Sequence, residues 1–129
     1  MARVLVAEDD WDTQEAIKQA LEDDGFTVQQ ALDGQSALDA LRASAVPLVV
    51  LLDLYLGLIS GETVLRSVAA DATLAARHRF IVVTAVPPAS PDIPYDLLTA
   101  LDIPLISKPF DLTTLLDAIH HAAQRLPHD

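Results

Sequence analysis

The chain has 129 residues, no cysteine and a hydrophobic fraction of 51%, so it can form one domain with a substantial core, without disulfides or thiolate zinc sites. Its formal net charge of -11, from 19 acidic and 8 basic side chains, would repel a nucleic-acid backbone and favours a cation or a basic protein surface as partner. No apolar run approaches the roughly 20 residues that span a bilayer, and no leader pattern opens the chain. We therefore expect a single domain over residues 1–129 that is soluble and cytoplasmic, with no direct nucleic-acid partner and no membrane partner.

Apolar runs alternate with helical patterns through the first part of the chain. The run RVLVA at residues 3–7 is short and partly β-branched, which predicts a buried strand. A helix should follow and end near Gly25, with a buried face made of Ala16, Ile17, Ala20 and Leu21. FTVQQA at residues 26–31 predicts a second strand, and residues 33–44 predict a short second helix.

The middle of the chain continues this alternation and then departs from it. PLVVLLD at residues 47–53 is apolar on both faces, as a central parallel strand must be. Residues 60–76 predict one long third helix, and RFIVVTA at residues 79–85 predicts a fourth strand. Four prolines between Val86 and Leu98 then forbid a regular helix until about Tyr95, so the fourth helix should be shortened or irregular.

The last strand and helix complete the pattern. Residues 104–107 predict a fifth, short strand, and Asp111 is a suitable N-cap for a final helix. The buried face of that helix is predicted to contain Leu112, Leu115, Leu116, Ile119 and Ala123. Five consecutive strand–helix units indicate an α/β fold, with a doubly wound, flavodoxin-like parallel sheet of order 2-1-3-4-5 whose ligands bind at the carboxyl ends of the strands.

Polar side chains follow four of the five predicted strands. Glu8 and Asp9 follow the first strand, Asp53 ends the third, Thr84 lies at the end of the fourth, and Lys108 follows the fifth. Each has an ordinary structural interpretation when taken alone, such as a helix cap, a solvated strand end or a surface lysine. Because neighbouring strands lie about 4.8 Å apart, the proposed sheet would bring these groups to one edge.

Three carboxylates at one edge would repel one another unless a cation were bound. Glu8, Asp9 and Asp53 supply the oxygen ligands that Mg²⁺ prefers, so we predict a magnesium site. A carboxylate can also act as a nucleophile toward phosphorus and form an aspartyl phosphate. We therefore predict that Asp53 accepts a phosphoryl group, while Lys108 and Thr84 bind two of its oxygens.

The ordered segments VLVAEDD, VVLLDLYLGLISG, IVVTA and SKPF resemble the receiver domain of two-component response regulators across essentially the whole chain. The resemblance implies a receiver, either of the stand-alone type or cut from a larger protein, that takes phosphate from a sensor histidine kinase or a histidine phosphotransfer protein. The resemblance leaves enzymatic activity uncertain: it does not imply a classical enzyme, but Mg²⁺-dependent self-phosphorylation from a phosphodonor and slow autodephosphorylation are expected. Phosphorylation would change the binding of a downstream protein whose identity the sequence does not reveal.

The resemblance also implies individual roles. Asp9 would bind the metal directly, Glu8 largely through water, and Tyr55 through its backbone carbonyl. Thr84 matches the switch hydroxyl and Lys108 the invariant lysine, which in this family precedes a cis peptide bond to proline.

Departures from the family pattern concern signal transmission. Leu105 replaces the aromatic switch residue of the fifth strand, Gly57 stands where the family usually has proline, and prolines interrupt the fourth helix. These departures keep open a different function, namely an adaptor that docks a partner independently of phosphorylation. A phosphatase using an aspartate nucleophile is disfavoured because Tyr55 stands where a second acid is expected. A flavin or nucleotide protein is disfavoured because the turn after the first strand is acidic.

Overall fold

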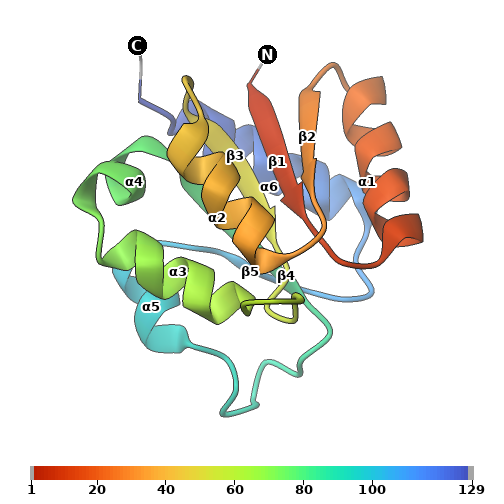
Figure 1. Ribbon diagram of the computed structural model, residues 1–129. Coiled ribbons are helices and arrows are strands. Elements are labelled where there is room, and N and C mark those ends of the chain that lie inside the picture. Colours follow the sequence, from red (N-terminus) through yellow and green to blue (C-terminus); the bar gives the residue numbers. More distant parts are fainter. Residues whose placement is uncertain (1, 128–129) are drawn as a thin grey trace.

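The computed structural model describes residues 2–127 and contains one parallel sheet (Figure 1). The strand order is β2-β1-β3-β4-β5, which confirms the predicted doubly wound α/β topology. The strands are β1 Arg3–Ala7, β2 Thr27–Ala31, β3 Leu48–Leu52, β4 Arg79–Thr84 and β5 Leu105–Ser107. Every neighbouring pair is parallel, so all five carboxyl ends meet at one edge of the sheet.

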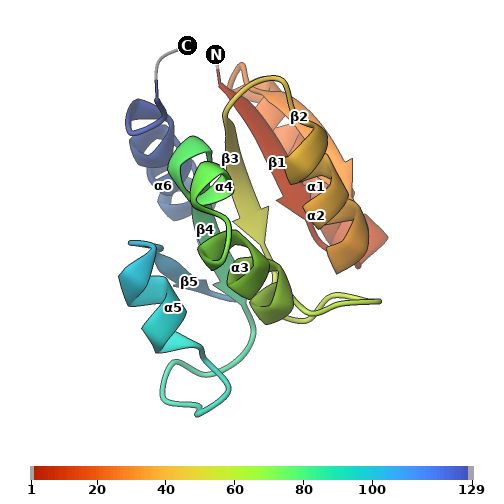
Figure 2. The same ribbon diagram turned by 60° about the vertical axis from the view of Figure 1, so that its left-hand side comes forward.

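Helices cover both faces of this sheet, as Figure 1 and the turned view in Figure 2 show. They are α1 Trp11–Asp23, α2 Gly34–Ala43, α3 Gly61–Ala69, α4 Ala72–Arg77, α5 Tyr95–Ala100 and α6 Leu112–Gln124. Two apolar clusters separate the layers: one contains side chains of α1 and α6, and the other contains side chains of α2 to α5. The helices return the chain to the amino edge of the parallel sheet, so every loop from a strand to a helix lies at the carboxyl edge.

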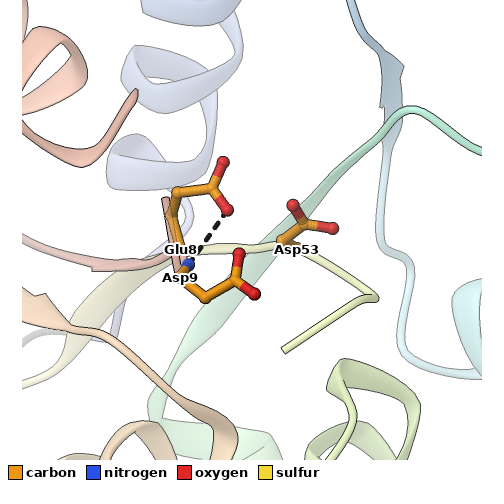
Figure 3. A group of neighbouring side chains, drawn as sticks. All are labelled: Glu8, Asp9 and Asp53. Carbon is orange, nitrogen blue, oxygen red and sulfur yellow. Dashed lines mark hydrogen bonds between the residues drawn. The ribbon is translucent and has the colours of Figure 1, made fainter. Parts of the chain in front are cut away.

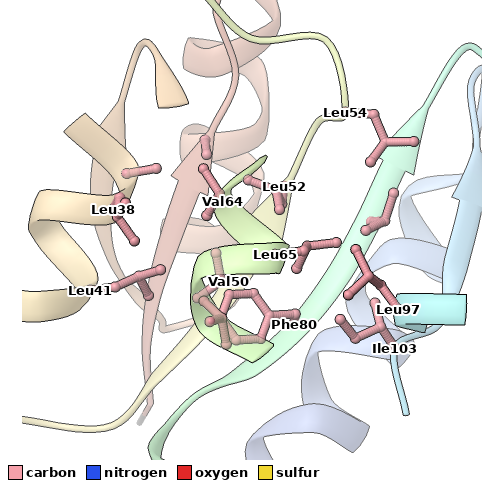
Figure 4. Packing of buried hydrophobic residues seen from close by; sticks show 14 of the residues in the cluster. Leu38, Leu41, Val50, Leu52, Leu54, Val64, Leu65, Phe80, Leu97 and Ile103 are labelled. Atoms are coloured by element: carbon pink, nitrogen blue, oxygen red, sulfur yellow. The ribbon is translucent and has the colours of Figure 1, made fainter. Parts of the chain in front are cut away.

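The strands contribute alternate residues to the two clusters. In β3, Val50 and Leu52 pack under α2 and α3, whereas Val49 and Leu51 pack under α1 and α6. All five β3 residues are buried, which explains why its sequence is apolar on both faces. Figure 4 shows the cluster that contains side chains of α2 to α5, in which Leu65 of α3 packs among side chains of the sheet and α5.

Two details of the helices differ from the sequence predictions. The predicted third helix is two helices, because Ala70 ends α3 and the side chain of Asp71 accepts hydrogen bonds from the backbone N–H groups of Thr73 and Leu74 at the start of α4. Leu112 is 49% exposed rather than buried, because the first turn of α6 extends beyond the edge of the core. In α1, Ala16 is likewise exposed, and the inward position one turn before Ile17 is occupied by Gln14.

The fourth predicted helix is short and begins late, as the prolines require. It is α5, which has six residues and starts at Tyr95 directly after Pro94. No side chain caps its first turn, and the segment before it is held by turns, including a hydrogen bond from Ser90 N–H to Pro87 O. Among residues 2–127, no helix is both long enough and apolar enough to cross a membrane.

Candidate functional site

Backbone hydrogen bonds carry the sheet one residue past three of its strands and thereby position the polar groups. Glu8 N–H donates to Ala31 O at 3.1 Å, and Asp53 N–H donates to Ala7 O at 3.1 Å. On the other side of the sheet, Lys108 N–H donates to Thr84 O at 2.8 Å. The candidate residues therefore start from a rigid backbone instead of from free loops.

Glu8, Asp9 and Asp53 form a compact acidic cluster (Figure 3). One carboxylate oxygen from each residue lies within 4.8 Å of the other two. Glu8 and Asp53 are only 4% and 9% exposed, whereas Asp9 is exposed at the rim. Asp9 N–H donates to Glu8 Oε2 at 3.0 Å, which orients the buried carboxylate. Such a cluster has the chemistry of a site for a hard divalent cation.

Lys108, which follows β5, contacts two residues of the cluster. Its Nζ donates to Glu8 Oε1 at 2.7 Å and to Asp53 Oδ2 at 2.9 Å. If Lys108 had been directed away from Asp53, the prediction of a phosphoryl acceptor at Asp53 would have been contradicted. The observed contact is consistent with that prediction. Burial by itself would lower the pKa of Lys108, but the hydrogen bonds to both carboxylates more than compensate and raise it above its ordinary value. Lys108 is therefore held as a cation.

The electrostatics of the cluster leave an excess of negative charge. Burial raises the pKa of Glu8 above its ordinary value, Lys108 acts in the opposite direction, and the nearby charge of Asp53 raises it further. The cluster has three carboxylates, and the single ammonium group of Lys108 pairs with only two of them, Glu8 and Asp53, so a divalent cation would relieve the remaining repulsion. The residues present thus fit a magnesium ion.

Thr84 and Tyr55 lie beside the cluster but make different contacts. Thr84 is completely buried, and its Oγ1 accepts a hydrogen bond from Val86 N–H at 3.2 Å. Tyr55 N–H donates to Asp53 Oδ1 at 3.0 Å, while its side chain is 59% exposed. All six predicted site residues thus lie at or next to one edge of the sheet, and the Lys108–Pro109 bond is cis, as the family resemblance implies.

Gln14 is a supporting residue that the sequence analysis did not identify. Its side chain is fully buried, and its Nε2 lies 3.0 Å from Val6 O, 3.1 Å from Glu8 O and 3.0 Å from Ala31 O. These contacts hold the ends of β1 and β2 together directly beneath Glu8. The sequence feature that could have identified Gln14 is its spacing. It occupies the same helical face as Ile17 and Leu21, where an apolar residue is usual.

The loop that follows Asp53, residues 54–60, is held tightly against two helix starts. Gly61 N–H donates to Leu54 O at 2.9 Å, and Gly34 N–H donates to Gly57 O at 3.0 Å. A Cβ atom on Gly34 would lie 2.0 Å from Ile59 O, and one on Gly61 would lie 2.2 Å from Asp53 O. Both positions therefore need glycine for close backbone approach.

Comparison with known folds agrees with this geometry. The receiver domain of Francisella response regulator 1452 has a TM-score of 0.83 and 22% sequence identity, covering 97% of this chain and 98% of that one. The Thermotoga maritima response regulator TrrA, solved in complex with Mg²⁺-BeF, has a TM-score of 0.78 and 24% identity, covering 95% of this chain and 99% of that one. At these identities the likeness establishes the fold.

A sequence relative and a family model address the family. The transcriptional regulatory protein CseB of Streptomyces avermitilis is 32% identical over 125 residues, which cover 97% of this chain and 50% of CseB. The chain therefore spans about half the length of that relative. The family model described as response regulator receiver domain matches residues 4–120. The chain belongs to the response regulator receiver domain family.

Proposed function

We propose that the chain is a phosphoacceptor in two-component signalling and that Asp53 receives the phosphoryl group. The observation that carries this proposal is the placement of Lys108 Nζ 2.9 Å from Asp53 Oδ2, with Glu8 and Asp9 completing an acidic cluster around the same carboxylate. A buried carboxylate with an adjacent cation has both the nucleophile and the charge compensation that phosphoryl transfer requires.

In the proposed reaction, a carboxylate oxygen of Asp53 attacks the phosphorus atom of the donor. A new P–O bond forms on Asp53 while the bond between phosphorus and the donor's leaving group breaks, and the leaving group departs with that electron pair. Lys108, freed from its contact with Asp53 Oδ2, binds one oxygen of the transferred group. The hydroxyl of Thr84 donates to another while still accepting from Val86 N–H.

Glu8, Asp9 and Asp53, with the backbone carbonyl of Tyr55, are proposed to hold Mg²⁺. When bound, the ion would neutralise charge on the phosphoryl oxygens and on the carboxylates. Asp9 is the exposed member of the cluster and is therefore the most accessible to a hydrated ion. Glu8 is buried and bonded to Lys108, in keeping with a role through water.

The physiological donor is proposed to be a sensor histidine kinase or a histidine phosphotransfer protein, acting on residues 1–129 as a single receiver domain. Phosphorylation would then change the affinity for a downstream protein. CseB is named a transcriptional regulatory protein and is about twice as long as this chain. The charge of -11 disfavours direct contact between this domain and a phosphate backbone.

A phosphorylation-independent adaptor remains the second candidate, because the region after Thr84 is unusual. The proline-containing segment leads into a six-residue α5, and Leu105 offers no aromatic partner for a switch hydroxyl. The adaptor hypothesis predicts the same partner affinity for unphosphorylated and phosphorylated protein.

The decisive experiment uses small reagents and needs no kinase. Acetyl phosphate with Mg²⁺ should add one phosphoryl group to the wild-type chain, detectable by intact mass, and beryllofluoride with Mg²⁺ should change the fluorescence of Trp11, which follows the acidic pair. Both responses should disappear in Asp53→Asn. If the wild-type chain were not labelled, or if Asp53→Asn were labelled equally, the proposed acceptor would be wrong.

A further inference from the structure

Leu58 combines two unfavourable features five residues after the proposed acceptor. Its backbone has φ of 65°, in the left-handed region where a leucine Cβ is crowded. Its side chain is 82% exposed, the highest value among the exposed large apolar side chains of residues 2–127. A backbone outlier in a fixed loop near a functional site suggests a function for that residue.

A loose loop does not explain this conformation. Gly57 O accepts from Gly34 N–H at 3.0 Å, and Leu54 O accepts from Gly61 N–H at 2.9 Å, so both ends of the loop are fixed. The neighbouring side chains of Leu56 and Ile59 pack against the core. Leu58 alone of these three is directed outward, from a loop that projects beside the start of α2 in Figure 2.

The surroundings of Leu58 are apolar and acidic. Among residues 2–127, seven large apolar side chains are exposed, and all except Val46 follow the carboxyl end of a strand: Trp11, Leu32, Tyr55, Leu58, Tyr95 and Leu112. Leu32 lies on the loop that is hydrogen-bonded to the Leu58 loop through Gly34. Exposed carboxylates at this same end include Asp9, Asp10 and Asp12.

We propose that Leu58, together with Leu32 and Tyr55, forms a docking surface for the protein phosphodonor, which presents an apolar contact flanked by basic side chains. This inference rests on the proposed function of Asp53. Asp53 is only 9% exposed and lies at this edge, so a protein that delivers a phosphoryl group must cover the surrounding loops. Charge complementarity to the exposed carboxylates requires a basic partner face. A small donor such as acetyl phosphate needs none of these contacts.

The test compares protein and small-molecule donors on the same variants. Leu58→Gly and Leu58→Asn remove the apolar side chain and tolerate a positive φ, so both should fold with equal or higher thermal stability. Val46→Asn is the matched control, because Val46 is also exposed but precedes β3 at the opposite end of the sheet. The probes are radiolabelled histidine kinase cores, screened as a panel, and acetyl phosphate with Mg²⁺.

The two Leu58 variants should lose about tenfold in the transfer rate from the fastest kinase core, which is the effect of removing one strong contact. Their labelling by acetyl phosphate should match wild type, as should both rates of Val46→Asn. Added salt should slow transfer from the kinase core more than labelling by acetyl phosphate.

Unchanged transfer from the kinase core to both Leu58 variants would overturn the docking surface. So would a wild-type chain that is labelled by acetyl phosphate but by none of the kinase cores. A wild-type dimer that Leu58→Gly converts to monomer would overturn it in favour of a second copy of the chain. Failure of acetyl phosphate to label the wild-type chain is a different result, because it would refute the proposed function itself.

Discussion

Lys108 is the residue on which the electrostatics of the site depend. It is one of two lysines in the chain and the only cation bonded to Glu8 and Asp53 within the described residues. Removing it would leave two buried carboxylates without their shared donor and would deprive a transferred phosphoryl group of one positive ligand. Both consequences slow transfer, because loss of a single electrostatic donor commonly costs about 10²–10³ in rate.

We therefore predict that Lys108→Ala reduces labelling by acetyl phosphate by roughly 10²-fold or more. Time courses of intact mass would measure the rate, with far-ultraviolet circular dichroism to confirm folding. Lys18→Ala is the matched control, since Lys18 lies in α1 and should leave the rate unchanged. Equal rates for Lys108→Ala and Lys18→Ala would show that the ammonium group makes no contribution to transfer.

His78 is a buried titratable residue outside the site. Its side chain is 1% exposed; Nδ1 accepts from Leu48 N–H at 3.0 Å, and Nε2 lies 3.2 Å from Leu41 O. This pairing needs the neutral ring with its proton on Nε2, because Nδ1 must remain an acceptor. Burial lowers the pKa of His78, and the charges of Arg77 and Arg79 lower it further, against the opposing hydrogen bond to Leu41.

The lowered pKa of His78 makes the free energy of unfolding depend on pH. In the unfolded chain, His78 binds a proton with its ordinary pKa of 6.5, whereas in the folded chain the lowered pKa means that it does so only at lower pH. Stability from this residue is therefore complete above pH 6.5 and is lost as pH falls toward the folded-state value. Urea unfolding at about pH 7.5 and about pH 5.5 should show this loss in wild type.

The variant His78→Gln should show a smaller loss of stability on acidification than wild type. At neutral pH it should be about 1–3 kcal/mol less stable, because the two backbone groups lose part of their pairing. His121→Gln is the control, since His121 is exposed on α6. Glu8, whose pKa is raised, also contributes to the pH dependence of stability, but it does so equally in wild type, His78→Gln and His121→Gln and therefore cancels in the comparison. Identical pH dependence in His78→Gln and wild type would exclude His78 as its source.

At the level of elements, the loop that follows Asp53 (residues 54–60) depends on two glycines, Gly34 and Gly61, that permit close packing. A methyl group on Gly34 would overlap the backbone of Ile59, and one on Gly61 would overlap the backbone of Asp53. Backbone cannot move aside as a flexible side chain can, so each substitution must displace α2, α3 or the loop that carries the acceptor. Overpacking of this kind typically costs about 1–3 kcal/mol.

We predict that Gly34→Ala and Gly61→Ala lower the free energy of unfolding by about 1–3 kcal/mol. Gly61→Ala should also slow labelling by acetyl phosphate, because it displaces the backbone of Asp53, the proposed acceptor. Gly57→Ala is the matched control, since the nearest atom to its added Cβ is 4.0 Å away. Chemical denaturation and labelling rates would measure both effects. Stabilities equal to that of Gly57→Ala would mean that the close contacts are not restrictive.

The elements differ in how well sequence predicted them, and the reasons are physical. β1 was predicted with its observed bounds because an apolar run between polar residues has few other interpretations. The break between α3 and α4 was missed because alanines on either side of Asp71 favour a continuous helix, although aspartate is also a good N-cap. The late start of α5 was predicted because proline excludes a regular helix directly.

The same distinction holds for the site. Glu8, Asp53 and Lys108 could be placed together from sequence, because parallel topology brings the ends of their strands to one edge. Gln14 and His78 could not, because a buried polar side chain is explained only by partners on other elements. For Gln14 those partners are carbonyl groups at the ends of β1 and β2, and for His78 they are backbone groups of α2 and β3.

For the whole molecule, the net charge of -11 should make the stability of the fold depend on cations. Any salt should stabilise the fold to some degree by screening repulsion between surface carboxylates. Mg²⁺ should stabilise it further, because an ion that binds only the folded state adds RT ln(1 + [Mg²⁺]/Kd), about 2.7 kcal/mol at one hundred times Kd. At roughly 3–5 °C per kcal/mol, that gain is readily measured as a shift in Tm.

The two effects can be separated with matched solutions and one variant. The Tm of wild type should be higher in magnesium chloride than in sodium chloride of equal ionic strength, because we propose that Glu8, Asp9 and Asp53 bind the divalent ion together. Asp9→Asn should lose this difference and keep the response to sodium chloride, since it removes one ligand from an exposed position and leaves the Lys108 pairs intact. Asp12→Asn, which removes an exposed charge outside the cluster, should retain the difference. If magnesium and sodium chloride raised the Tm of wild type equally, the acidic cluster would be acting only through general screening, and the proposed magnesium site would be wrong.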